Sequence, residues 1–158
     1  KCRVSSEEMY FSIGAHPAFN CNLGDTLTFE YDETLYSERI DRDSVITGDK
    51  DLILQNSNKI ELTEHLFDKD ALIFSNVKSN YVILNEKKAG KHIRFTFGDS
   101  PFLAIWAKPA APFVCIEPWY GVNDSYEKAT DFSKKRGIQK LSSGKEFEFS
   151  WSAEFKED

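Results

Sequence analysis

Short segments that alternate between apolar and polar residues, or that are apolar throughout, recur along the whole chain and are separated by turn residues. Leu27, Phe29 and Tyr31 alternate with polar neighbours, and Phe102–Trp106 is a continuous apolar run. The first pattern is typical of a half-buried strand and the second of a fully buried one. Because turn signals return about every 8 to 12 residues, the sequence predicts an all-β protein, a sandwich or a barrel.

Composition favours the same fold class. Of the 158 residues, 41% are hydrophobic and 14% aromatic, with 13 phenylalanines against one methionine. Aromatic and β-branched residues are enriched in strands. The length is that of one domain, or of a piece of a larger one. We therefore expect residues 1–158 to form a single domain.

Three local patterns predict particular elements. Tyr81–Leu84 and His92–Phe97 are strand-like and flank Lys88–Gly90, which indicates a β-hairpin. Phe147–Phe155 alternates cleanly between apolar and polar residues and predicts an amphipathic strand. Thr47–Asp51 is turn-like.

Charge and cysteine content exclude several classes of function. The net charge is −6 and no basic block is present, which argues against a nucleic-acid partner. No apolar run approaches the ~18 residues of a membrane span. The cysteines, Cys2, Cys21 and Cys115, are few and unpaired in spacing, so we expect reduced thiols in a cytoplasmic protein. Cys115, within an apolar run, is interpreted as a small buried hydrophobe. The spacing of the cysteines and histidines predicts no zinc site, and no nucleotide-binding motif is present.

One carboxylate stands in an unusual position. Val114–Ile116 is the centre of an apolar run bounded by prolines, and Glu117 follows it directly. We expect this run to be a buried strand with Glu117 at its end, where the chain leaves the sheet. A buried carboxylate is costly unless it is paired, hydrogen-bonded or used. The local residues leave both readings open: a strand cap or a functional group.

Two further polar residues occur beside predicted strands. His16 follows Gly14-Ala15 and precedes Pro17, which favours an extended conformation for the histidine. Asp70 lies directly before an apolar run. Taken alone, His16 fits a structural histidine as well as a catalytic one, and Asp70 fits an ordinary turn aspartate.

A sheet that brought His16, Asp70 and Glu117 to one rim would place an acid and a carboxylate base in one cleft. Phe19, Trp106 and Trp119 would then offer flat apolar faces for stacking on sugar rings. Such a site suits proton transfer on a small polar molecule. It suits passive sugar binding equally well.

The segment Phe11–Phe19, followed about 100 residues later by Pro112–Trp119 and Gly121, resembles the aldose 1-epimerase (galactose mutarotase-like) superfamily, in its bacterial mutarotase-like branch. Phe67–Phe74 is similar to the middle motif of that branch. The pattern of Gly137, Ile138, Leu141, Gly144 and Trp151 is similar to its closing hairpin. The similarity covers nearly the whole chain, in the order of the family.

The resemblance implies a large antiparallel β-supersandwich of roughly twice this length, of which this chain would be the C-terminal part. It implies that Glu117 is the general base, that His16 is the general acid and that Asp70 binds a sugar hydroxyl. It further implies interconversion of the α and β anomers of a hexose such as galactose or glucose. No cofactor and no metal is required.

Two expectations concern what accompanies the chain. The sequence begins with Lys1-Cys2 and no methionine, so we expect an N-terminal part outside it. In the family, that part supplies an arginine and another histidine to the sugar site. We expect the missing half, or a second copy in a homodimer, to complete the fold, and the resemblance leaves open whether this stretch alone is active.

The alternatives are a non-catalytic carbohydrate-binding or regulatory protein on the same fold, and a hexose-6-phosphate 1-epimerase. A phosphorylated substrate would favour a basic cluster near the cleft. Arg94, Lys108 and Arg136 are too scattered in the sequence to indicate one. The sugar is therefore not determined by the sequence.

Overall fold

The computed structural model describes residues 2–3, 7–87, 90–127, 129 and 131–157. Within that part of the chain, almost all regular structure is β-strand, and the one helical element is the short 3₁₀ turn η1 (Phe132–Lys134). None of the described helical structure is long and apolar enough to cross a membrane. The strands are, in chain order, β1 (Cys2–Arg3), β2 (Met9–Phe11), β3 (Ile13–Gly14), β4 (Ala18–Asn20), β5 (Thr26–Ile40), β6 (Ile46–Glu61), β7 (Leu72–Ser75), β8 (Tyr81–Asn85), β9 (Lys91–Thr96), β10 (Phe102–Trp106), β11 (Phe113–Tyr120), β12 (Gln139–Leu141), β13 (Glu146–Phe147) and β14 (Ser152–Glu157).

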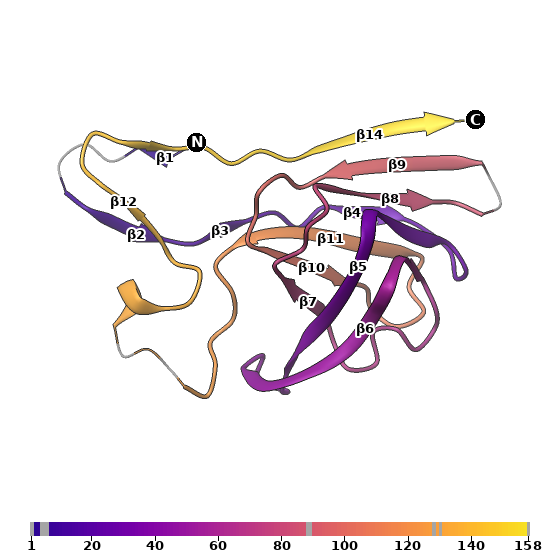
Figure 1. Ribbon diagram of the computed structural model, residues 1–158, viewed down its shortest axis with the longest axis horizontal. Helices are drawn as coiled ribbons and strands as arrows, with labels where there is room; N and C mark the ends of the chain where they lie inside the picture. The colour runs from indigo at the N-terminus through magenta and orange to yellow at the C-terminus, as the bar shows by residue number, and fades with distance from the viewer. Residues whose placement is uncertain (1, 4–6, 88–89, 128, 130, 158) are drawn as a thin grey trace.

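One sheet of ten strands contains most of the molecule. Its order is β14-β9-β8-β5-β7-β10-β11-β3, with β6 paired to β5 and β4 paired to β11. The pairings between named strands are antiparallel. Two small two-stranded sheets, β1-β13 and β2-β12, form an arm beside the main sheet (Figure 1). The predicted all-β antiparallel fold is confirmed.

The two faces of the main sheet carry cores of different size. The larger core contains the fully buried side chains Phe29, Phe74, Phe95, Phe97, Leu27, Leu84, Leu103, Ile105, Ile116, Val82 and Val114. The smaller core contains Ile46, Ile73, Phe102, Ala104 and Val122. Successive residues of a strand point to opposite faces, so β10 and β11 supply side chains to both cores. The face of the smaller core is the one that carries the candidate site.

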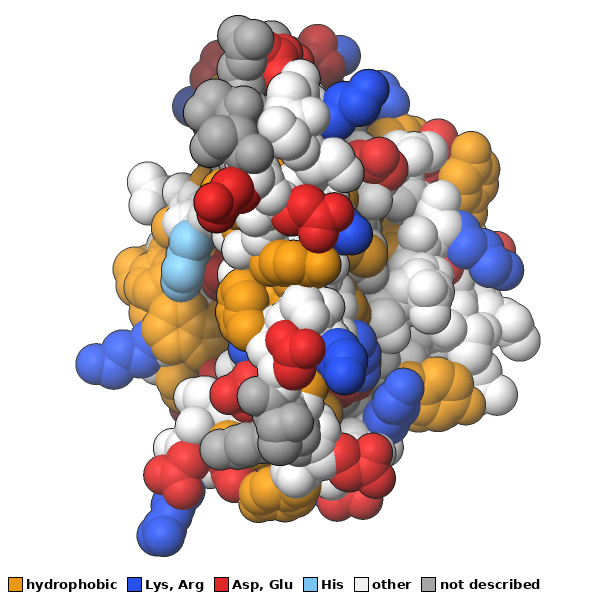
Figure 2. Space-filling model, turned by 90° about the vertical axis from the view of Figure 1, so that its left-hand side faces the viewer, with side chains coloured by type: hydrophobic (Ala, Val, Ile, Leu, Met, Phe, Trp, Pro, Cys, Tyr) orange, Lys and Arg blue, Asp and Glu red, His pale blue; other side chains and the backbone are white. Residues whose placement is uncertain are grey.

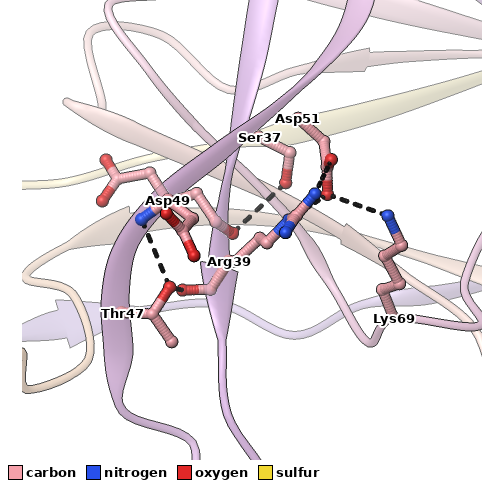
Figure 3. A network of polar contacts seen from close by, with 7 residues as sticks. Ser37, Arg39, Thr47, Asp49, Asp51 and Lys69 are labelled. Carbon is pink, nitrogen blue, oxygen red and sulfur yellow. Dashed lines mark hydrogen bonds and ion pairs between the residues drawn. The ribbon is translucent and has the colours of Figure 1, made fainter.

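The hairpin of β5 and β6 is the longest pairing in the fold, and polar contacts connect its strands (Figure 3). Arg39 Nε donates to Asp51 at 2.7 Å, and Lys69 Nζ lies 3.5 Å from the same carboxylate. The prediction of a turn at Thr47–Asp51 is wrong, because these residues lie inside β6. The Thr47 hydroxyl donates to the Arg39 carbonyl, and the Asp49 N–H donates to that hydroxyl, so the polar residues bond across and along the strand.

The predicted hairpin of β8 and β9 is confirmed, with Val82 paired to Phe95 and Leu84 to Ile93. Its turn residues 88–89 lie outside the described residues. The predicted amphipathic strand Phe147–Phe155 is broken, since β13 ends at Phe147 and β14 begins at Ser152. β14 lies at the edge of the main sheet and pairs with β9. Phe155 in this strand remains 70% exposed. Alternation alone did not show that this segment leaves one sheet and joins another.

Candidate functional site

His16 and Glu117 face each other across two neighbouring strands. Gly14 pairs with Trp119 in β3–β11, and Ala18 pairs with Cys115 in β4–β11. These two pairs belong to the same register, which places His16 directly opposite Glu117 between them. The residues between β3 and β4 therefore continue the line of the sheet.

Two prolines explain why the ladder is interrupted at this place. Ala15 N–H donates to the Pro118 carbonyl at 3.1 Å, and Ile116 N–H donates to the Pro17 carbonyl at 3.2 Å. Each of these pairs lacks its reciprocal bond, because proline has no N–H to donate. The pair between them is thus of the type without backbone hydrogen bonds, in which opposite side chains lie closest together.

The contact between the two side chains agrees with this register. His16 Nδ1 lies 3.4 Å from Glu117 Oε1, and the side chains are 62% and 5% exposed, respectively. Glu117 also pairs with Ala104 of β10 on its other side, so the carboxylate lies within the sheet. The prediction that Glu117 ends its strand is wrong, since β11 continues to Tyr120. A histidine open to solvent is thus held against a buried carboxylate.

The environment of Glu117 raises the pKa of its carboxyl above the ordinary glutamate value of 4.5. Burial is the main cause, because a charged group loses hydration inside the protein. The charge of His16 and a hydrogen bond from the Trp119 side chain act in the opposite direction and favour the ionised form. Glu117 therefore has the character of a carboxylate that takes up a proton more readily than one in water.

Two tryptophans flank the pair on the same sheet face. Trp119 lies two residues after Glu117 in β11, and Trp106 pairs with Cys115, two residues before it. The rings of Trp106 and His16 are in an edge contact, with centroids 6.3 Å apart and an interplanar angle of 89°. Trp119 packs against the smaller core. An aromatic side chain thus lies on each side of the His16–Glu117 pair.

The other two predicted site residues, Phe19 and Asp70, have different surroundings. Phe19 lies on the opposite face of the sheet, in the larger core, where its ring is 5.6 Å from that of Phe95. Its position corrects its assignment to the sugar wall, because Phe19 and His16 are an odd number of residues apart in an extended segment. Asp70 is exposed, in a turn before β7, with a φ of 79° and its carboxylate bonded to the Ala71 N–H. Asp70 comes two residues before the start of β7 at Leu72.

Cys115 is a neighbour that the sequence pattern did not indicate as part of the site. It is buried, as predicted, and burial together with the charge of Glu117 raises the pKa of its thiol to about 11. Yet Cys115, Glu117 and His16 each offer one atom of the kind that ligates metals, and these three atoms lie within 4.8 Å of one another. The signal in the sequence was the spacing of two between Cys115 and Glu117, which puts both on one face of a strand.

Charges on the surface are mixed. On the face of the molecule seen from the left of Figure 1, acidic and basic side chains are interspersed around hydrophobic patches (Figure 2). This view agrees with the spread of charge along the sequence.

No family model matches the chain. Among curated proteins, the plasmid and chromosomal forms of Protein LacX from Lactococcus lactis subsp. lactis are each 33% identical to it over 147 residues. These alignments cover 87% of this chain and 49% of the relative. The chain thus spans about half the length of the curated relatives it matches.

Comparison with solved structures shows which proteins share the fold of this chain. A galactose mutarotase related enzyme from Lactobacillus acidophilus aligns with a TM-score of 0.86 and 30% identity, over 97% of this chain and 54% of that one. A galactose mutarotase-like protein from Lactobacillus casei ATCC 334 aligns with a TM-score of 0.84 and 29% identity, over 96% and 55%. A protein from Synechocystis sp. PCC 6803, with a TM-score of 0.58 and 19% identity over 95% and 44%, shares the fold alone. The predicted resemblance is confirmed.

Proposed function

Because this chain is galactose mutarotase-like in both sequence and fold, we propose that the protein containing it is an aldose 1-epimerase, an isomerase. Its reaction interconverts the α and β anomers of a hexose such as galactose or glucose. The observation that carries the proposal is the His16–Glu117 pair, with 3.4 Å between Nδ1 and Oε1.

Anomer interconversion requires one proton to leave a sugar oxygen while another arrives at its neighbour. The anomeric hydroxyl and the ring oxygen are bonded to the same carbon. An acid and a base on adjacent positions of a sheet can therefore reach both oxygens at once. General acid and general base each contribute typically about 10²–10⁴-fold to such a reaction.

In the proposed mechanism, Glu117 accepts the proton of the anomeric hydroxyl while protonated His16 donates a proton to the ring oxygen. The bond between the anomeric carbon and the ring oxygen breaks, and its electron pair goes to that oxygen as the carbonyl forms. Rotation about the next carbon–carbon bond exposes the other face of the carbonyl. On ring closure the attacking hydroxyl returns its proton to His16, and Glu117 gives its proton to the carbonyl oxygen. Both residues thus recover their starting states, and the cycle needs no co-reactant.

The surroundings of the pair support this assignment. Burial favours uptake of a proton by Glu117, whereas Trp119 stabilises the ionised form that must be present before the reaction. A base whose two states are both accessible is the more effective catalyst. Trp106 and Trp119 offer apolar faces for the sugar ring, and we assign Asp70, which precedes the start of β7, a contact with a sugar hydroxyl.

We further propose that residues 1–158 form the C-terminal part of a larger β-supersandwich. The aligned relatives are nearly twice as long as the matched region, with 54% and 55% of the two solved chains covered. The remaining walls of the sugar site would come from residues outside this sequence, in the same protein or in a second copy. The exposure of His16 is consistent with a site open on that side.

The described cysteines support a reducing compartment. Cys21 and Cys115 are both buried free thiols. Sparse unpaired cysteines are the usual state in the cytoplasm. We therefore assign the reaction to the cytoplasm.

Polarimetry tests the proposal. The longest natural protein that contains this sequence is added to freshly dissolved α-glucose, α-galactose and the corresponding hexose 6-phosphates, and the approach to anomeric equilibrium is followed. We expect acceleration with at least one of these sugars, and loss of about 10²-fold or more in Glu117→Gln and in His16→Gln. Glu64→Gln, which changes an exposed glutamate, is the matched control and keeps the wild-type rate.

Each other outcome has a definite meaning. Saturable sugar binding that survives in Glu117→Gln, with no acceleration by the wild type, identifies a carbohydrate-binding protein and contradicts the epimerase proposal. Acceleration with the phosphorylated sugars alone identifies a hexose-6-phosphate 1-epimerase.

A further inference from the structure

Three different metal-ligand groups converge beside β11. Cys115 and Glu117 are two residues apart on the strand and share one face, and His16 stands opposite Glu117. The ligand atoms of the three side chains, one sulfur, one oxygen and one nitrogen, lie within 4.8 Å of one another. Cys115 and Glu117 belong to β11, and His16 lies between β3 and β4, which both pair with β11, so the arrangement is built by the backbone register.

We propose that His16, Cys115 and Glu117 form a binding site for a borderline-soft divalent cation of the Zn²⁺ class, and that the bound ion blocks the acid–base pair. The second part rests on the proposed function. The ion is an inhibitory ligand in this proposal and takes no part in the epimerase reaction.

The distances fit one ion of this class. Zinc binds thiolate sulfur at about 2.3 Å and histidine nitrogen or carboxylate oxygen at about 2.0–2.2 Å, so the ligand atoms of one tetrahedral ion are roughly 3.5 Å apart. His16 Nδ1 and Glu117 Oε1 already lie 3.4 Å apart. The His16 ring is 62% exposed and has room to move as the remaining separations close.

The donor types select the ion. Nitrogen and sulfur ligands suit Zn²⁺ and its neighbours, whereas Mg²⁺ and Ca²⁺ prefer sites made of oxygen alone. Three protein ligands leave one tetrahedral position for water or a sugar hydroxyl. The thiol of Cys115 loses its proton to solvent when its sulfur coordinates the ion. The buried carboxylate of Glu117 gains a nearby positive charge that offsets its lost hydration.

Occupation of the site is incompatible with the mechanism above. The metal takes the Nδ1 lone pair of His16, so the imidazole no longer becomes doubly protonated and loses its function as the acid. It also takes an oxygen of Glu117, which lowers the affinity of the carboxylate for a proton. Both halves of the acid–base pair are therefore lost together.

Direct binding of Zn²⁺ to the full-length protein tests the site without reference to activity. Titration calorimetry is done on the wild type and on Cys115→Ala, His16→Gln and Cys21→Ala. Cys21 is the matched control, because it is also a buried free thiol but belongs to the larger core. We expect one Zn²⁺ site to weaken by more than about tenfold in Cys115→Ala and in His16→Gln, and to keep its affinity in Cys21→Ala.

Co²⁺ supplies a second measurement that reports sulfur coordination. The wild type should show a thiolate-to-metal absorption band that is present in Cys21→Ala and absent in Cys115→Ala. If Cys115→Ala fails to fold, His16→Gln, which changes an exposed side chain, tests the same site. We then expect the band to appear only at higher Co²⁺ concentration, because the affinity for Co²⁺ is lower. The proposal is overturned if the wild type and His16→Gln bind Zn²⁺ with equal affinity. It is also overturned if the wild type binds Mg²⁺ as tightly as Zn²⁺.

The effect on catalysis is measured separately. We expect one equivalent of bound Zn²⁺ to suppress mutarotation, and a chelator to restore it. Zinc binding with no epimerase activity in the zinc-free protein contradicts the proposed function and leaves the metal site standing. Full activity with Zn²⁺ bound contradicts the blocking effect alone.

Discussion

Glu33 and Glu117 are both buried carboxylates, with 2% and 4% of their surface exposed, but their surroundings differ. Glu33 Oε1 accepts three hydrogen bonds, from the backbone N–H groups of Lys78 and Ser79 at 3.0 and 2.8 Å and from the Ser79 hydroxyl at 2.8 Å. Such bonds offset the hydration that an ionised group loses on burial. Glu33 thus ties β5 to the chain before β8.

Glu117 has fewer polar partners than Glu33, and these partners are of a different kind. Among the described residues, those that favour its ionised form are the His16 ring and the Trp119 side chain, and burial still raises its pKa. Its neighbour His16 is open to solvent, whereas Ser79 is buried. Burial of a carboxylate therefore does not by itself indicate a site. A buried carboxylate that has few hydrogen-bond donors and lies beside an exposed histidine is the stronger indication.

Glu38, a third buried glutamate, has an intermediate environment. Its Oε2 lies 2.8 Å from Arg136 Nη2, and the arginine side chain is 50% exposed. The guanidinium also lies over the Phe102 ring, 5.2 Å from its centroid. A permanent cation compensates this carboxylate, whereas a titratable histidine stands beside Glu117.

The largest effect that we expect from this comparison is on stability at Glu33. Glu33→Ala leaves the Ser79 N–H and hydroxyl without their buried acceptor, and we expect the free energy of unfolding to fall by about 3 kcal/mol. Glu117→Gln removes a buried charge of similar exposure, and we expect it to leave stability unchanged or raise it. Urea denaturation of both variants measures the difference. A larger loss in Glu117→Gln than in Glu33→Ala would contradict the structural role of Glu33.

A smaller effect is expected when the support of Glu117 is disturbed. A Cβ on Gly14 would lie 2.7 Å from Trp119 Cδ1 and 3.2 Å from the Pro118 carbonyl oxygen. Gly14→Ala must therefore shift the indole that bonds Glu117, at a cost of about 1 kcal/mol in stability. We expect mutarotation to slow by about tenfold, which corresponds to about 1.4 kcal/mol of lost transition-state stabilisation.

Trp119→Phe separates the hydrogen bond that Trp119 donates to Glu117 from the packing of its ring. It keeps an aromatic ring but removes the N–H donor, so the pKa of Glu117 should rise further and the acidic limb of the pH–rate profile should move to higher pH. A Gly14→Ala variant with a wild-type rate and an unmoved profile would show that Trp119 does not act through Glu117.

The smallest effect is the dependence of stability on pH. The folded-state pKa of Glu117 is raised above its ordinary value of 4.5, so the folded protein holds this proton more tightly than the unfolded chain. Its contribution to stability is fully present below about pH 4.5 and is lost as pH rises through the raised pKa. The groups that face Glu117 are His16 and Cys115. Unfolding measured from pH 4 to 8 should show this decline in the wild type, and a flatter curve in Glu117→Gln.

The sequence by itself determined the fold class and most strands. Period-two alternation predicted β5 from Leu27, Phe29 and Tyr31, and the apolar runs predicted β10 and β11 as neighbours. Side-chain alternation is a local property of an extended chain, so it can be read without knowing the partners. The same rule could have placed Phe19 on the face opposite His16. The break after Phe147 was not readable, because the segment changes sheets without changing its pattern.

Tertiary structure decided what surrounds each candidate residue. Periodicity shows which residues of one strand share a face, but the pairing register decides which residue of another strand lies beside them. The register of β3 and β4 with β11 brings His16 to Glu117 and adds Cys115 to the cluster, although about 100 residues of sequence lie between. Burial of Glu117 and exposure of His16 follow from the position of their strands in the sheet. The roles that we propose for both residues depend on that difference.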